Sequence, residues 1–156
     1  MNTKNNIKIG YKILKIYTSK FNFTEELTDE DIDKLILKNK IEISINTNIN
    51  LVSDEELVID IIAKFKNTET DIVLIEHSGR TCFGLNGVPK GKETDDKTQD
   101  YNLPRDLVAQ LFSLAYSHSR VLLVNELNPT VFKFKFFLPI ISGDKISKIL
   151  KNPKKS

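Results

Sequence analysis

The sequence predicts an α+β protein in which a four-stranded antiparallel sheet precedes one long and one short C-terminal helix. Three observations support this prediction. Between Ile7 and Leu85, apolar and polar residues alternate in several runs, as they do in strands with one buried face. Only short turns separate the later runs, which indicates antiparallel hairpins. From Leu103 onward, apolar residues recur instead at helical spacing.

The first predicted strand is long and irregular. It begins at Ile7 and ends at Phe23, and its alternation changes phase near Leu14, which indicates a β-bulge in an edge strand. The acidic residues that follow Thr28 are typical of a helix N-terminus, so we expect a short helix or a helical excursion there.

The regular part of the predicted sheet is a meander. In residues 41–51, isoleucine or leucine occupies almost every odd position and a polar residue every even one. A turn at 53–55 leads to a second alternating run at 57–65, and 71–85 supplies the last strand. Gly79 is expected to mark a bulge or twist.

The longest amphipathic segment begins at Leu103, with Pro104 at a position that a first helical turn tolerates. Its apolar stripe is broad and consists of Leu107, Val108, Leu111, Leu114, Ala115, His118, Val121 and Leu122. Lys133 to Phe136 has β-like alternation, which predicts lysines on one side and phenylalanines on the other. Residues 144–150 predict the short second helix, capped by Ser142 or Asp144.

The length favours a single domain, residues 1–156, with flexible ends at 1–6 and 152–156 and a mobile loop at 86–102. The sequence has one cysteine, no signal peptide and no apolar run long enough to span a bilayer. We therefore expect a cytoplasmic protein without membrane insertion. The net charge of +2 is too small to indicate nucleic-acid binding.

Enzyme chemistry finds little support in the sequence. His77 and His118 are the only histidines, and His118 lies in the apolar stripe, where an interior histidine is the simplest interpretation. His77 and Cys82 are near enough in sequence to suggest a nucleophile and base, but a strand that carries both is usually only a strand. One cysteine and two distant histidines do not make a zinc site. We expect neither an enzyme nor a cofactor.

The sequence does contain more apolar surface than a protein of this size can bury. One long helix covers one face of a sheet, and the isoleucines of 41–51 and the short helix add further apolar area. Exposed apolar patches usually mark partner surfaces. An obligate oligomer and a groove for unfolded polypeptide both follow from this, and the two are compatible.

The order of these segments resembles the export chaperone SecB and its relatives over nearly the whole chain. The matching residues are Ile16-Tyr17-Thr18 followed by Phe21 and Phe23; Leu74-x-Glu76 followed by Gly79, Phe83 and Gly87-Val88; Pro104 before the helix that ends in Ser119-Arg120; and Leu138-Pro139-Ile140 followed by Asp144. Each motif alone is weak, and their order and spacing carry the resemblance.

The resemblance implies a homotetramer, a dimer of dimers whose long helices lie between two large sheets, and grooves that bind non-native polypeptides. By position, the peptide-binding residues would be Ile41, Ile43, Ile45, Phe83, Leu85, Val88, Ile146, Ile149 and Leu150. The oligomer interface would include Leu107, Leu111, Leu114, His118 and Arg120.

The resemblance also implies a motor-docking surface, because SecB docks on the translocase motor SecA through carboxylates on its sheet. Leu74 and Glu76 match part of that surface, but Lys20 and Thr24 stand at its two acidic positions on the first strand. We therefore expect weak or absent docking. The expected function is a holdase for unfolded polypeptides, serving export or a dedicated client such as an antitoxin. The alternative is an oligomeric interaction protein with the same fold and no chaperone activity.

Overall fold

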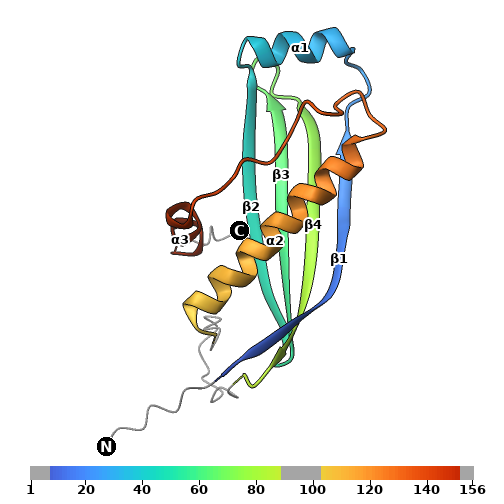
Figure 1. Cartoon of the computed structure of the whole chain (residues 1–156). Coiled ribbons are helices and arrows are strands. Elements are labelled where there is room, and N and C mark those ends of the chain that lie inside the picture. The colour runs from blue at the N-terminus through green and yellow to red at the C-terminus, as the bar shows by residue number, and fades with distance from the viewer. Residues whose placement is uncertain (1–7, 89–102, 152–156) are drawn as a thin grey trace, which may run out of the picture.

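The computed structural model describes residues 8–88 and 103–151. A four-stranded antiparallel sheet carries one long helix on one of its faces (Figure 1). The elements in chain order are β1 (Gly10–Phe23), α1 (Asp29–Leu37), β2 (Ile41–Ser53), β3 (Glu56–Asn67), β4 (Val73–Asn86), α2 (Arg105–Leu127) and α3 (Gly143–Lys151). The sheet order is β1-β4-β3-β2, so the first two strands of the chain form its two edges.

The irregular edge strand and the short helix after Thr28, both predicted for the first part of the chain, are confirmed. β1 is an edge strand, and its register against β4 shifts between Ile13 and Lys15 and again between Thr18 and Lys20, so it has two irregularities where one was predicted. Thr28 caps α1: its side chain accepts a hydrogen bond from the Asp31 N–H, and the Asp31 carboxylate accepts one from Thr28. α1 lies across one end of the sheet (Figure 1).

The strand register separates an apolar face from a polar one. Odd-numbered residues of β3 from Leu57 to Phe65 face α2 and are fully buried. The opposite face, here called the outer face, holds Lys64, Lys66 and the ion pair between Arg80 and Asp60. Only one face of the sheet therefore needs to be covered by a helix.

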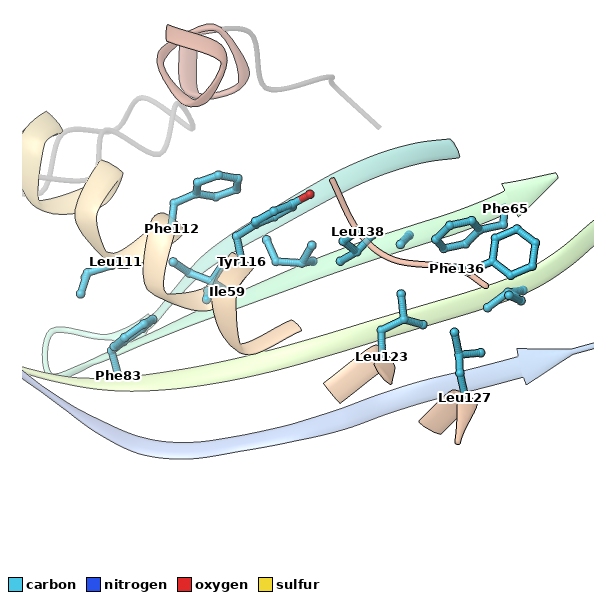
Figure 2. Close-up of a cluster of buried hydrophobic side chains, with 14 of the residues drawn as sticks. Ile59, Phe65, Phe83, Leu111, Phe112, Tyr116, Leu123, Leu127, Phe136 and Leu138 are labelled. Carbon is cyan, nitrogen blue, oxygen red and sulfur yellow. The ribbon is translucent and has the colours of Figure 1, made fainter. Parts of the chain in front are cut away.

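α2 runs diagonally over the apolar face and provides most of this cover (Figure 1). Figure 2 shows Leu111 of α2 next to Ile59 and Phe83 of the sheet, with Leu123 and Leu127 farther along the same buried cluster. Helix and sheet approach closely at Gly79, where an added Cβ would lie 2.3 Å from the Ser119 hydroxyl and 3.2 Å from the Ser119 Cα. Glycine is therefore required at position 79, because any side chain would displace α2.

By length and composition α2 is also the one described helix that could cross a membrane. The core helix of a soluble protein passes the same test, and α2 is attached to the sheet by polar contacts as well as apolar ones. His118 is hydrogen-bonded to Thr81 at 3.0 Å, and Ser119 to the carbonyl of Gly79 at 3.5 Å.

The segment between α2 and α3, residues 128–142, differs from the prediction. Residues 131–135 form a turn instead of a strand, with Phe134 at a φ of 63°. Phe132 and Phe136 are buried and Phe134 is 73% exposed, so the predicted division into a lysine side and a phenylalanine side is wrong. The left-handed residue reverses the chain, which breaks the alternation that a strand needs. We call residues 136–142 the crossover, because they pass over the sheet towards β2 (Figure 1).

The predicted flexible ends, and most of the predicted loop at 86–102, lie outside the described residues.

Candidate functional site

Three of the predicted peptide-binding residues lie near the start of the edge strand β2. Ile41, Ile43 and Ile45 point to the same side as α2, and Ile43 remains 42% exposed. Ile43 is paired with Phe65 of β3, whose ring packs on that of Phe136 at 5.3 Å. The crossover therefore lies beside these isoleucines.

Three others lie at the opposite end of the sheet. Phe83 is completely buried and packs edge-on against Tyr11 at 6.1 Å, and Leu85 is 6% exposed. The register aligns Phe83 with Leu57 and Leu51. Leu51 lies eight residues from Ile43, which corresponds to about 27 Å along a strand. Val88 is partly buried, just after β4. The structure does not bring the predicted peptide-binding residues into a single site.

The remaining three lie on α3, which contacts α2. The chain enters this helix through Ser142, whose carbonyl accepts from the Ile146 N–H and whose hydroxyl accepts from the Lys145 N–H. Ile146 and Ile149 pack partly against the core, and Leu150 is also partly buried. Their assignment to peptide binding stays a prediction.

The crossover contributes apolar residues that sequence reasoning missed. Ile140 is 82% exposed and Phe137 52% exposed, whereas Leu138 between them is buried. Tyr116 of α2 holds this segment in place by donating a hydrogen bond to the Pro139 carbonyl at 2.6 Å. Residues 136–141 contain no polar side chain, so no pattern in the sequence separates the exposed residues from the buried ones. We define the crossover surface as Ile41, Ile43, Ile45, Phe137, Ile140, Ile146 and Ile149.

Two hollows of the described structure lie away from the crossover surface. One, of about 670 Å³, opens at the far end of the sheet between Lys12, Glu55 and Leu85, and a second, of about 300 Å³, lies on the outer face between Ser44 and Lys64. Charged residues line both of them, and no residue of the crossover surface lines either one. The exposed side chains of the crossover surface are thus open to solvent, which is compatible with a long and variable ligand.

The two predicted docking residues have different environments. Leu74 is 1% exposed and belongs to the core, so of this pair only Glu76 lies on the outer face. Lys20 lies 3.0 Å and Lys64 3.6 Å from the Glu76 carboxylate. The hydrogen bond from Lys20, aided by the charge of Lys64, holds the pKa of Glu76 below its usual range. The carboxylate is thus already neutralised by its neighbours.

The five predicted interface residues divide into two groups. Leu111 is completely buried against its own sheet, His118 bonds to Thr81, and Arg120 donates to the Leu138 carbonyl at 3.2 Å. The side chains of these three residues therefore already have packing or hydrogen-bond partners within one protomer. Leu107 and Leu114 stay partly exposed, and the most exposed apolar residue of α2, Val121 at 61%, was not among the five.

His77 and Cys82 cannot act together, because they lie on opposite faces of β4. His77 is buried beneath α2 and shares a hydrogen bond with Thr18, whereas Cys82 faces outward beside Val58. Burial lowers the pKa of His77 to about 4 and raises the pKa of the Cys82 thiol. Neither perturbation favours a nucleophile. Within residues 8–88 and 103–151, no three histidine, cysteine or acidic side chains gather as a metal site requires.

The structure is similar to the Rv1957 SecB-like chaperone of Mycobacterium tuberculosis, solved with a ChAD peptide from the Rv1956 HigA1 antitoxin. The TM-score is 0.54 and the identity 12%, over 85% of this chain and 91% of that one. A protein of unknown function from Streptococcus agalactiae matches at a TM-score of 0.40 and 8% identity, over 85% of this chain and 99% of that one. Neither a protein-family model nor a curated protein sequence matches the chain. The SecB-like α+β fold is confirmed.

Proposed function

We propose that this SecB-like fold serves a molecular chaperone, a holdase that binds unfolded polypeptides without chemical change. The observation that carries the proposal is the amount of apolar surface left exposed beside an otherwise complete core. Ile43, Phe137 and Ile140 are each more than 40% exposed and lie on the crossover surface. The Rv1957 SecB-like chaperone, which has a similar fold, was solved with an antitoxin peptide, which supports the same class of ligand here.

A holdase needs no catalytic group, only apolar contacts that outweigh the cost of ordering the client. Burial of apolar surface contributes roughly 25 cal/mol per Å². Immobilising each flexible side chain of the client costs about 0.5–1.5 kcal/mol. Affinity at one such surface is therefore modest, and several copies of the surface on one oligomer raise it by multivalency. Multivalency is the reason that we propose a homotetramer. We also propose that it acts in the cytoplasm, on clients in export or on a dedicated client such as an antitoxin.

The proposed holdase is tested by suppression of the aggregation of a reduced, unfolded model protein. We expect suppression at one oligomer per client molecule. The double variant Ile43→Asp/Ile140→Asp should abolish it while the fold is retained, since both side chains are exposed. Val52→Asp, in the same strand as Ile43 and 61% exposed, is the matched control and should suppress normally.

Two outcomes would favour the alternative, an oligomeric interaction protein without chaperone activity. One is the absence of suppression by the unaltered protein at any ratio. The other is dissociation of the oligomer by Ile43→Asp/Ile140→Asp, which would make the crossover surface a subunit contact.

We further propose that docking on the motor SecA is weak or absent, because Lys20 and Lys64 neutralise Glu76 on the outer face. Titration with the zinc-binding C-terminal tail of the motor should show no saturable binding. The variant Lys20→Glu removes one partner of Glu76 and adds a carboxylate, so it should strengthen any residual binding. Tight binding by the unaltered protein would refute this proposal.

A further inference from the structure

The free edge of β2 presents backbone groups in a known order. The Thr68 N–H donates to the Lys40 carbonyl at 2.9 Å, directly ahead of the pairing of Ile41 with Asn67. Bonded and non-bonded pairs alternate along an antiparallel ladder. Even-numbered residues of β2 therefore bond to β3, and the odd-numbered ones direct their N–H and C=O groups away from the sheet.

The first half of this edge lacks the usual protection. For Ile41, Ile43, Ile45 and Thr47, no partner of the outward backbone groups lies within the described ranges 8–88 and 103–151. Residues 41–47 contain no lysine and no proline, and Glu42 is their one charged residue. Long uncharged edges invite pairing with another strand, so natural proteins normally shield them.

The side chains beside this edge add apolar and polar contacts. Ile41, Ile43 and Ile45 belong to the crossover surface, so a strand placed against β2 would direct alternate side chains towards it. Figure 1 shows the crossover and α3 on this side of the sheet. The Thr47 hydroxyl points to the same side and is buried with no hydrogen-bond partner in the described structure. A buried hydroxyl without a partner is costly, and an added chain could supply one.

We propose that the client binds as an extended fifth strand on β2, through the backbone groups of Ile41, Ile43, Ile45 and Thr47. This mode rests on the proposed holdase function and deepens it. Backbone bonds are indifferent to client sequence, whereas the crossover surface selects apolar residues at every second position. The preferred client segment is extended, alternates apolar with polar residues and lacks proline.

The protein side of the mode is tested with Ile45→Pro against Ile45→Ala. Both variants shorten the side chain, but proline alone removes the outward N–H, and an edge strand tolerates proline whose N–H side faces solvent. Binding of a reduced, carboxymethylated model protein should weaken about tenfold more in Ile45→Pro than in Ile45→Ala, as expected for one backbone hydrogen bond. Equal affinities of the two variants would overturn strand addition.

The ligand side is tested with a synthetic peptide in which phenylalanine or valine alternates with threonine, measured by fluorescence anisotropy. N-methylation at alternate residues in one phase should abolish binding, and in the other phase should leave it unchanged. If the parent peptide binds and both methylated series bind equally, the holdase function stands and strand addition falls. If Ile45→Pro instead lowers the mass of the free oligomer with client affinity intact, β2 pairs with a second copy and the proposal is wrong.

Discussion

His77 is fully enclosed between the sheet and α2, and its Nδ1 atom has no hydrogen-bond partner among the described residues. Its other ring nitrogen is hydrogen-bonded to Thr18, and the Phe21 ring lies 6.3 Å away. Protonation would place an uncompensated charge in this apolar setting, which explains a pKa of about 4. The imidazole is therefore a structural group that requires its neutral form.

The pH dependence of stability follows from that requirement. The unfolded chain takes up a proton at His77 near pH 6.5, whereas the folded chain does so only near pH 4. The stabilisation is thus complete above pH 6.5 and is lost as the pH falls towards 4. The full loss amounts to about 3 kcal/mol. Urea unfolding between pH 7 and 4 measures it.

The variant His77→Gln identifies the residue responsible. Glutamine retains a partner for Thr18 and does not titrate, so its unfolding free energy should vary less with pH than that of the unaltered protein. His118→Gln is the comparison: burial also lowers the pKa of His118, so this variant reports the share of the pH dependence that the second histidine contributes. If the unfolding free energies of the unaltered protein and His77→Gln change with pH in parallel, His77 is not the cause of the pH dependence.

Among the elements, the contact between α2 and β4 depends on two small residues. Because a Cβ at position 79 would collide with Ser119, Gly79→Ala should destabilise the protein by about 1–3 kcal/mol. Adding Ser119→Gly removes the hydroxyl and Cβ from the collision, so the double variant should recover part of the loss. Gly143→Ala is the control, since nothing lies within 4 Å of its added Cβ, and it should change the unfolding free energy little. Additive losses in the double variant would contradict this account.

The same contact shows what the sequence could and could not predict at this scale. Alternation identified the strands and the apolar side of β3, because side-chain direction follows directly from a period of two. It could not show depth: Ile43 and Phe83 have the same pattern, yet one is 42% exposed and the other completely buried under α2. Depth depends on where the helix crosses the sheet. The turn at Phe134 was missed because nothing local requires a left-handed phenylalanine.

In the whole molecule, two regions each hold several of the exposed apolar side chains. One is the crossover surface, and the other combines β1 with the outward side of α2, where Tyr11, Ile13, Ile16 and Val121 are each between 37% and 61% exposed. The first region suits clients in the proposed function. We propose that a symmetric neighbour buries the second region, since two-fold contacts bring the same patch of both copies together.

Val121 therefore provides the test of assembly. Val121→Asp places a charge in the proposed subunit contact, and we expect light scattering to report a lower mass than for the unaltered protein at equal concentration. The control is Val52→Asp, because Val52 is also 61% exposed but lies at the far end of β2, outside this region. Circular dichroism should be unchanged in both variants, since neither side chain belongs to the core. An unchanged mass in Val121→Asp would show that this side of α2 is not a subunit contact. A monomeric unaltered protein would also exclude the multivalency that the holdase mechanism uses.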